Sequence, residues 1–443
     1  MSIEKDIPAI FLSQLSPRAI ETIGKVQQFV DTNCVPADPI FHSQLSTNPE
    51  LRWKLTPEIM DKLKLKAQEE GLWNLFLNKR YAEGPGYTNL EYGLMAFYMG
   101  RCFTAPEATN CNAPDTGNME LLARFGTPYQ KKQWLQPLLD GKIRSAFLMT
   151  EKGVSSSNAL NISTTAIRNS KGNFVLNGVK WFALGAGDPR CSVWLVMCKT
   201  SEDAAVRYRN HSVLVLDAKK AIASGKAKVI RPLTVYGYDD APHGHCEIEF
   251  NDYVIDDEEM EHCILAAESR GFELIQSRLG PGRIHHCMRL IGAAEYAMLK
   301  VVQRANTREI FGKLLKDREN FMMEFAQHKI NIERCKLLVL NAAHKIDISS
   351  TKDSQREISI AKIETPRTVL NVIDWCLQMY GAEGVSQDTP LSYMWAANRT
   401  LRIADGPDEA HLFQLARREA KQFAEVDEYF QRYDQNYQRL LKL

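Results

Sequence analysis

The stretch Ala146–Glu151, Ala-Phe-Leu-Met-Thr-Glu, followed by Ser155–Ser157, lies where the residue pattern of the chain changes. Before it, apolar residues such as Ile20, Ile23 and Val26 recur at the spacing of amphipathic helices. After it, the chain contains short segments that are β-branched or that alternate between apolar and polar residues, which is typical of strands. The stretch therefore marks the entrance to a β part of the chain.

The segments with strand character are 174–176, 192–197, 212–216 and 247–250. Asn177-Gly178 predicts a tight hairpin between 174–176 and 179–182, because both residues tolerate a positive φ. From residue 272 the pattern returns to long helices, including 283–307, 317–346 and 357–380. The chain is therefore predicted to be an α+β protein with four parts: an N-terminal helical domain (1–145), a middle β-sandwich or barrel domain (146–265), a C-terminal helical bundle (266–420) and a helical tail (421–443).

Composition narrows the class of protein. The 443 residues exceed a usual single core, and 55 basic against 54 acidic residues give no reason to expect nucleic acid or an anionic membrane as a partner. Ten cysteines without a Cys-x-x-Cys pair indicate a reducing compartment, and no apolar run approaches the roughly 18 residues of a membrane span. We expect a soluble intracellular protein of the cytoplasm or an organelle matrix; Leu441-Lys442-Leu443 is a weak match to the peroxisomal Ser-Lys-Leu signal.

Four motifs, together with the segment from Thr127-Pro128 to Gly141, resemble the acyl-CoA dehydrogenase family in the correct order and span nearly the whole chain. The stretch 146–151 with its serines resembles the family's flavin-binding segment, and Lys180-Trp181-Phe182 its second flavin strand. Residues 308–313 resemble the Arg-x-x-Phe-Gly motif, and 378–384 the glycine-rich helix end. The resemblance implies the acyl-CoA dehydrogenase fold.

Three phrases resemble one branch of that family more closely: residues 185–191, 238–245 and 404–409. Larger animal and plant members of this branch carry a fused kinase-like domain, which this chain lacks. Relatives in the branch favour long, branched or oxygenated acyl chains, and the sequence leaves the acyl group open.

The resemblance implies an FAD-dependent elimination, in which a carboxylate removes the α-proton of an acyl thioester while flavin N5 accepts the β-hydride. Asp405 aligns with the family base, which is Glu in most relatives. Some relatives carry the base just before Arg283 instead, where this chain has Gly282. Arg283 aligns with the arginine that orders the base and the thioester end of the substrate. Without the resemblance, Asp405 would be interpreted as a helix cap and Arg283 as a surface arginine.

The flavin-binding positions carried over from the family fall into three groups. One should line the flavin ring. A second should bind the rest of the cofactor: Arg308 its pyrophosphate, in the same site as Trp181, while Gln378, Gly381 and Gly384 reach the cofactor of a neighbouring subunit. A third follows the base, with Pro407 where a threonine is usual and Asp408 or Glu409 as a substitute contact. The first is Phe147, Met149, Thr150, Ser156, Trp181 and Ala183; the second is Arg308, Phe311, Gln378, Gly381 and Gly384; the third is Pro407 and Glu409.

The implied partners are an acyl-CoA substrate from fatty acid β-oxidation, an electron-transfer flavoprotein or similar acceptor, and further copies in a homodimer or homotetramer. Two alternatives stay open: a flavin oxidase of the same fold, either an acyl-CoA oxidase or a nitroalkane-oxidase-like enzyme with Asp as base, and a DNA-associated flavoprotein without turnover. The near-neutral charge argues against the second alternative. His243-x-His245 has metal-ligand residue types, but no distant second pair completes a site, so no metal is predicted. Gly280-x-Gly282 lacks the third glycine and the preceding strand of a dinucleotide-binding motif, so NAD is not predicted.

Overall fold

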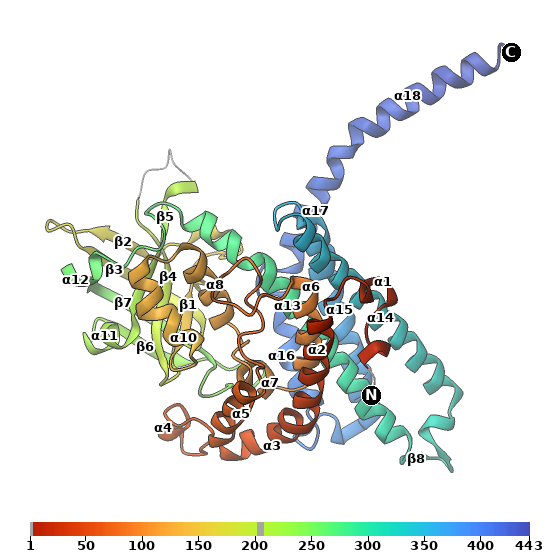
Figure 1. The fold of residues 1–443 in the computed structure, drawn as a ribbon, viewed down its shortest axis with the longest axis horizontal. Coiled ribbons are helices and arrows are strands. Elements are labelled where there is room, and N and C mark those ends of the chain that lie inside the picture. Colours follow the sequence, from red (N-terminus) through yellow and green to blue (C-terminus); the bar gives the residue numbers. More distant parts are fainter. Residues whose placement is uncertain (1–2, 202–207) are drawn as a thin grey trace.

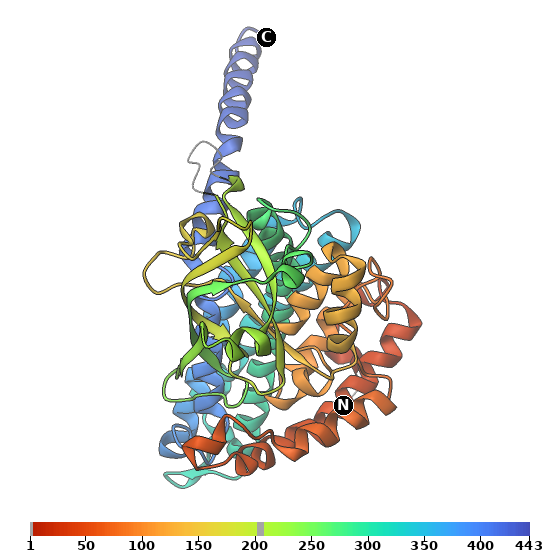
Figure 2. The same ribbon diagram turned by 90° about the vertical axis from the view of Figure 1, so that its left-hand side faces the viewer.

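The computed structural model describes residues 3–201 and 208–443 and contains a mixed sheet flanked by N-terminal and C-terminal helices (Figure 1). This arrangement confirms the predicted α+β fold class. A view turned by 90° shows the sheet in front of the helices and the last helix projecting away from the body (Figure 2). None of the helices in the described ranges combines the length and the apolar content that a membrane span requires.

The N-terminal helices surround one buried helix. Every residue of α6 (Asn89–Met99) is buried, and its first turn is closed by a capping box between Thr88 and Glu91. Glu91 also accepts from the backbone and hydroxyl of Ser16, at the start of a second helix. The other helices of this part are α1 (Ala9–Leu12), α2 (Pro17–Phe29), α3 (Val35–Gln44), α4 (Pro49–Arg52), α5 (Glu58–Glu69), α7 (Thr104–Ala108), α8 (Asp115–Phe125), α9 (Pro128–Gln130) and α10 (Gln136–Leu139).

The sheet has seven strands in the order β1-β4-β2-β3-β7-β6, with β5 paired to β4. Strand β4 (Cys191–Lys199) is apolar on both faces, as expected for a strand that is covered on both sides. Val193 and Leu195 pack in the helical core, whereas Trp194 and Val196 pack in a separate core. The strands are β1 (Arg144–Leu148), β2 (Thr165–Arg168), β3 (Phe174–Leu184), β4 (Cys191–Lys199), β5 (His211–Asp217), β6 (Ala227–Pro232) and β7 (His245–Val254).

The hairpin predicted at Asn177-Gly178 is wrong, because β3 runs straight through both residues. The register of β3 against β7 shifts between Leu176 and Gly178, so the pair forms a β-bulge. Gly178 has a φ of 145°, and a Cβ there would lie 2.6 Å from Thr164 Oγ1. The chain instead turns at residues 169–173, between β2 and β3. Asn-Gly is common in hairpin turns because it tolerates a positive φ, and a β-bulge requires the same backbone conformation.

The C-terminal bundle is built around α13 (Gly271–Ala305), which packs against α6, α14 and α15. The helix begins well before the predicted residue 283 and runs through Gly280 and Gly282, because packing overrides the low helix propensity of glycine. A Cβ at Gly280 would collide with Thr351. The remaining elements are α11 (Ala218–Ala223), α12 (Asp257–Met260), β8 (Glu309–Ile310), β9 (Lys313–Leu314), α14 (Glu319–Ile348), α15 (Gln355–Tyr380), α16 (Leu391–Arg399), α17 (Asp408–Glu419) and α18 (Phe423–Leu440).

Candidate functional site

The first group of predicted flavin residues gathers at one edge of the sheet. The Trp181 backbone N–H on β3 donates to the Thr150 carbonyl, just beyond β1, at 2.7 Å. Phe147 and Met149 pack against a small apolar cluster that includes Ile275 of α13, so this edge faces the bundle. Ala183, on the same strand as Trp181, is buried.

Trp181 and Ser156 were both predicted to contact the cofactor, but of the two only the Trp181 side chain has a polar atom left without a partner in the described part of the chain. The indole Nε1 of Trp181 is buried and has no hydrogen-bond partner among the described residues. A buried donor without a partner is costly, so a ligand acceptor would stabilise it. The Ser156 hydroxyl is already used within the chain, because it accepts from the Glu151 backbone N–H at 2.9 Å. Trp181 therefore fits a flavin contact, and Ser156 shapes the loop beside it.

A buried ion pair that sequence reasoning missed holds this edge. Lys180 Nζ lies 2.7 Å from Glu151 Oε1 and also donates to the Met149 carbonyl. Glu151 further accepts from the backbones of Ser163 and Thr164. Burial by itself would raise the pKa of Glu151, but Lys180 and these hydrogen bonds lower it to about 2. Because the pair joins the residues next to Thr150 and Trp181, it fixes the spacing of the two flavin segments.

Replacing Glu151 by Gln is expected to destabilise the protein by on the order of 3 kcal/mol at neutral pH, because Lys180 would remain buried without a counter-charge. The folded pKa of Glu151 lies below its unfolded value, so its contribution is present above about pH 4.5 and is lost as the pH falls towards 2. Urea unfolding between pH 7 and pH 3 should show the difference from wild type shrinking. Glu58→Gln, at an exposed pair with Lys62, is the control and should have little effect at any pH.

The second group of predicted flavin residues lies at the other end of the molecule. Arg308 precedes the small hairpin of β8 and β9, which Figure 1 shows at the end of the bundle remote from the sheet. Its guanidinium is half exposed and lies 3.9 Å from Glu383. Phe311, at the hairpin tip, is 97% exposed. Within one chain, Arg308 and Phe311 are therefore remote from Trp181, and the three residues do not form the single flavin site predicted for Arg308 and Trp181.

The two glycines of the second group have structural reasons of their own. Gly381 caps α15 with a φ of 62°, a conformation that glycine adopts at little cost. At Gly384 a Cβ would lie 2.7 Å from the Leu377 carbonyl. Gln378, in the last turn of α15, is exposed. Tight folding of this helix end explains the two glycines, whereas the Gln378 side chain, like those of Arg308 and Phe311, extends to solvent.

The predicted base, Asp405, lies in a loop between α16 and α17 that α13 supports. It has a φ of 57°, in the left-handed region that Asp and Asn tolerate better than most residues. The buried Arg283 donates from Nε to the Asp405 backbone carbonyl at 2.9 Å, and His411 Nε2 lies 3.3 Å from the same oxygen. The Asp405 side chain is 21% exposed, with Oδ2 3.6 Å from His286 Nε2. The structure thus brings together Arg283 and Asp405, the two predicted catalytic residues.

The alternative position of the base is open in space. A Cβ at Gly282 would meet no heavy atom within 4 Å, so the position next to Arg283 is not occupied by another side chain. After Asp405, Gly406 has a φ of 99°, and a Cβ there would lie 2.9 Å from His411 Nε2. The loop therefore depends on the absence of a Cβ at Gly406, whereas a Cβ at Gly282 would enter open space.

The residues after Asp405 begin α17. Pro407 precedes its first residue and Glu409 is exposed. Asp408, which sequence reasoning considered as a substitute cofactor contact, is buried and pairs with Arg367 at 2.9 Å and Arg402 at 2.7 Å. Asp408 therefore anchors the loop of the base to α15 and to the turn after α16. A charged residue beside an aligned base was the only sequence signal for this role.

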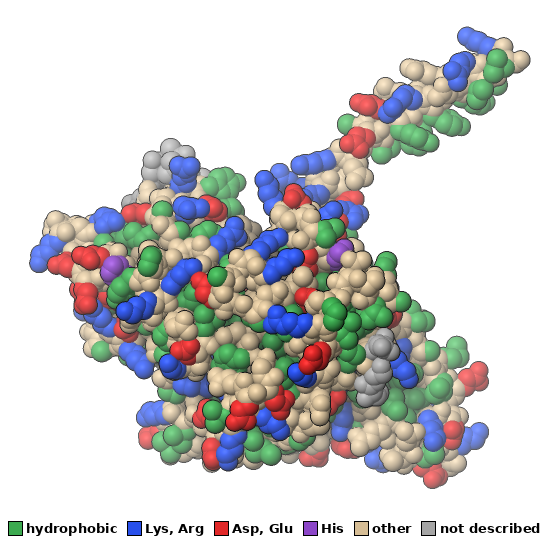
Figure 3. Space-filling view, in the orientation of Figure 1, with side chains coloured by type: hydrophobic (Ala, Val, Ile, Leu, Met, Phe, Trp, Pro, Cys, Tyr) green, Lys and Arg blue, Asp and Glu red, His purple; other side chains and the backbone are tan. Residues whose placement is uncertain are grey.

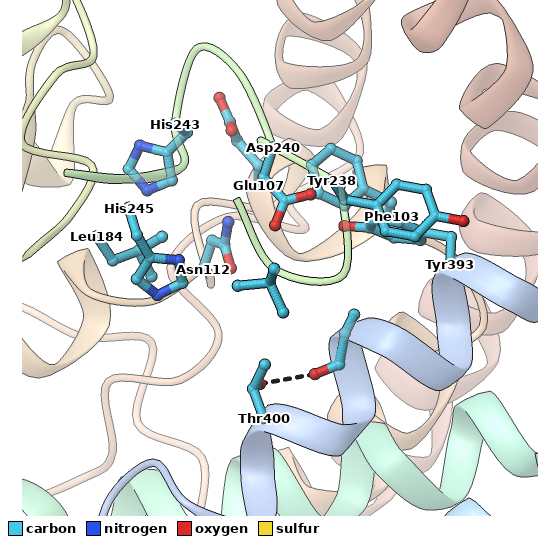
Figure 4. A pocket seen from close by; sticks show the side chains of 12 residues that line it. Phe103, Glu107, Asn112, Leu184, Tyr238, Asp240, His243, His245, Tyr393 and Thr400 are labelled. Carbon is cyan, nitrogen blue, oxygen red and sulfur yellow. Dashed lines mark hydrogen bonds between the residues drawn. The ribbon is translucent and has the colours of Figure 1, made fainter. Parts of the chain in front are cut away.

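A cavity of about 170 Å³ lies between the sheet, the N-terminal helices and α16 (Figure 4). Its wall includes Leu184, which follows Ala183 on β3, and Thr400, which precedes the loop of Asp405. Burial lowers the pKa of His245 to about 4, so this histidine is neutral at physiological pH. Tyr238 and Tyr393 meet edge to face at 5.0 Å. The other lining residues are Phe103, Glu107, Asn112, Val235, Asp240, His243 and Ala397.

Beside this cavity a buried network of charges joins the N-terminal helices to the sheet. Arg144 on β1 pairs with Glu107 of α7 and with Asp115 of α8, the latter at 2.7 Å. Arg144 also donates to His243 Nε2 at 2.9 Å, which leaves Nδ1 of His243 to donate to Asp188 at 3.1 Å. The two branch-specific phrases, 185–191 and 238–245, thus meet through Asp188 and His243. Among the described residues, no group of three or more His, Cys, Asp or Glu side chains could hold a metal ion.

The fold comprises an N-terminal helical part, a mixed sheet and a C-terminal helical bundle, and Phe147 and Met149 of the sheet part face α13 of that bundle. Family models of the acyl-CoA dehydrogenase N-terminal, middle and C-terminal domains match residues 24–142, 146–253 and 269–420. The chain therefore belongs to the acyl-CoA dehydrogenase family, as the sequence predicted.

Individual relatives agree with this assignment. Acyl-CoA dehydrogenase family member 11 of Gallus gallus is 45% identical over 91% of this chain, and the chain spans 50% of that relative's length. A probable acyl-CoA dehydrogenase of Mycobacterium tuberculosis is 46% identical over 82% of this chain and 86% of that protein. The structure of a putative acyl-CoA dehydrogenase from Mycobacterium abscessus has a TM-score of 0.86 at 39% identity and covers 92% of this chain and 99% of that chain. Butyryl-CoA dehydrogenase from Megasphaera elsdenii shares the fold, with a TM-score of 0.73 at 22% identity over 91% of this chain and 98% of that chain.

Proposed function

We propose that this chain catalyses the FAD-dependent α,β-dehydrogenation of an acyl-CoA thioester to a trans-2-enoyl-CoA, with Asp405 as the base. The observation that carries the proposal is the geometry of the Asp405 loop. Arg283 and His411 hold the loop through the backbone carbonyl of Asp405, and neither of these two contacts uses its carboxylate. Gly282 leaves the alternative position of the base without an acid.

In this reaction Asp405 takes the α-proton and holds it as a carboxylic acid until the product leaves. FAD, when bound, accepts the β-hydride. The thioester α-proton is far less acidic than a carboxylic acid, so the enolate charge must be stabilised while Asp405 acts. The cavity beside Leu184 and Thr400 supports the proposal, because it lies between the strand of the flavin residues and the segment that leads to the base.

Anaerobic mixing with a panel of acyl-CoA thioesters tests the reaction. The FAD-reconstituted protein is expected to lose its yellow absorbance on mixing and to recover slowly in air. Fast reoxidation in air would instead identify an oxidase, and a panel without any bleaching would contradict the proposal. A dye or electron-transfer flavoprotein should then restore turnover under nitrogen.

Flavin binding has a direct test at Trp181. The reconstituted wild-type protein is expected to be yellow, and Trp181→Phe should weaken FAD binding up to roughly tenfold, because one buried hydrogen bond is worth about 0.5–1.5 kcal/mol. Trp73→Phe is the matched control, since the Trp73 indole donates to the Leu139 carbonyl in the N-terminal part. Equilibrium dialysis against FAD gives both affinities. If wild type and Trp181→Phe bound FAD with equal affinity, Trp181 would not contact the cofactor. A wild-type protein that stayed colourless after reconstitution with FAD would contradict the proposed function.

Oligomeric state and flavin content are expected to be linked, because the second flavin group serves a neighbouring subunit in this proposal. Arg308→Ala and Phe311→Ala should lower flavin content without affecting folding, because both side chains are at least half exposed. Arg356→Ala, at an exposed pair with Glu419, is the control. Light scattering combined with flavin absorbance measures both quantities. A monomer with full flavin content would contradict the linkage.

A further inference from the structure

The last helix, α18 (Phe423–Leu440), projects from the body as a single helix (Figure 1 and Figure 2). Each of its residues is exposed. In proteins most of the stability of a helix comes from packing of its apolar face, so an amphipathic helix without such packing is expected to need another surface. The match to the family's C-terminal domain ends at residue 420, and the family fold therefore does not account for this helix.

One face of α18 carries a continuous line of large apolar side chains, visible as a green stripe in Figure 3. Successive members are three and four residues apart in turn, which is the a and d spacing of a coiled-coil heptad. The Tyr433 ring lies 6.4 Å from both Phe430 and Tyr437, as expected for neighbours on one face. The seam consists of Phe423 (68% exposed), Val426 (47%), Phe430 (57%), Tyr433 (54%), Tyr437 (50%) and Leu440 (59%).

The spacing of the apolar residues on α18 indicates what kind of structure packs against them. A spacing that averages 3.5 residues faces another helix of the same period along its whole length. The outward side of α18, by contrast, is polar and carries Glu428, Gln431, Gln435 and Gln438. The seam is therefore a narrow apolar line suited to one partner helix.

We propose that α18 pairs in antiparallel orientation with α18 of a second copy of this chain. In that orientation a positions face d positions, and the seam matches itself through three different residue pairs, each formed twice. Phe423 faces Leu440 of the second copy, and Phe430 faces Tyr433 of the second copy. Val426, the smallest member, faces Tyr437 of the second copy, so that a small side chain lies opposite a large one.

The charges of α18 favour this orientation. Its first half, 423–431, carries Glu425, Asp427 and Glu428 and no basic residue. Its second half, 432–440, carries Arg432 and Arg439 with one acid, Asp434. The antiparallel pair brings the acidic half of each helix alongside the more basic half of the other. A parallel pair would set like charges level. These exposed charges select the orientation more than they add affinity.

Disulfide trapping in the full-length protein tests the proposal. Val426→Cys/Tyr437→Cys is expected to form a covalent dimer of about twice the 50.3 kDa chain under mild oxidation. Within one helix these positions are roughly 16 Å apart, so no bond can form inside a chain. Nine of the ten native cysteines are buried and Cys102 is partly buried, so the parent protein is a clean reference.

The matched control is Glu428→Cys/Gln435→Cys, which has two cysteines equally level in the antiparallel pair but on the outward face. It should remain uncrosslinked, as should Val426→Cys alone, which would crosslink only in a parallel pair. Adding Phe430→Glu to Val426→Cys/Tyr437→Cys should reduce the crosslinked dimer at least tenfold. Absence of the dimer in the double-cysteine variant, or equal crosslinking of Val426→Cys alone, would overturn the proposal. None of these positions belongs to the proposed catalytic site, so flavin content and anaerobic reduction should not change in any variant, and the two proposals fail separately.

Discussion

Replacing Asp405 by Asn is expected to lower the rate of anaerobic flavin reduction by acyl-CoA by about 10²- to 10⁴-fold, the usual effect of losing a general base. Asn has nearly the shape of Asp but cannot accept the α-proton. The loop should keep its conformation, because Asn tolerates the left-handed φ of 57° at least as well as Asp. The hydrogen bond from Arg283 is made to the backbone carbonyl and is unaffected by the substitution.

Stopped-flow absorbance under nitrogen measures this rate directly, and flavin content and substrate affinity should match wild type. Asp388→Asn, at an exposed position of the same bundle, is the control and should reduce at the wild-type rate. If Asp405→Asn also reduced at the wild-type rate, the base would lie elsewhere. Asp405→Glu is a subtler comparison, because Glu adds a methylene and is less suited to the left-handed backbone. Strain of the order of 1 kcal/mol in this variant would appear as lower stability, separate from any change in rate.

Replacing Arg144 by Met is expected to destabilise the protein by about 3–5 kcal/mol, because it leaves two buried carboxylates without their shared cation. Arg144 is buried between Glu107 and Asp115. Burial by itself would raise the pKa of Glu107, but Arg144, Lys64 and Arg190 hold it well below its usual range. Without Arg144, part of this compensation is lost where α7 and α8 meet the sheet.

Urea unfolding followed by intrinsic fluorescence would measure the effect of Arg144→Met. Arg231→Met is the matched control, because Arg231 makes a 2.7 Å ion pair with Glu247 but is half exposed. Its loss should cost less than about 1 kcal/mol. Arg144→Met/Asp115→Asn should recover part of the lost stability, because Arg144 is the cation that the structure pairs with Asp115, whereas Glu107 keeps Lys64 and Arg190. Equal effects of Arg144→Met and Arg231→Met would show that the buried network does not hold the parts together.

The sequence alone predicted the helical, sheet and helical parts, because the period of apolar residues follows directly from helix and strand geometry. It also indicated the family, because 146–151, 180–182, 308–313 and 378–384 are local motifs in a fixed order. The predicted hairpin at Asn177-Gly178 was wrong, because a turn and a β-bulge both require a residue that tolerates a positive φ. Only contact with β7 and Thr164 distinguishes the two.

The tertiary structure decided which side chains share a site. Lys180 and Glu151, Arg144 and Glu107, and Arg402 and Asp408 are charged residues that sequence patterns place on solvated surfaces, yet each pair is buried or partly buried in the fold. The separation of Trp181 from Phe311 likewise followed from the packing of the sheet against the bundle. Local periodicity reports which face of an element is apolar, but ion pairs between distant segments depend on how those faces meet, and that is fixed only when the whole chain packs.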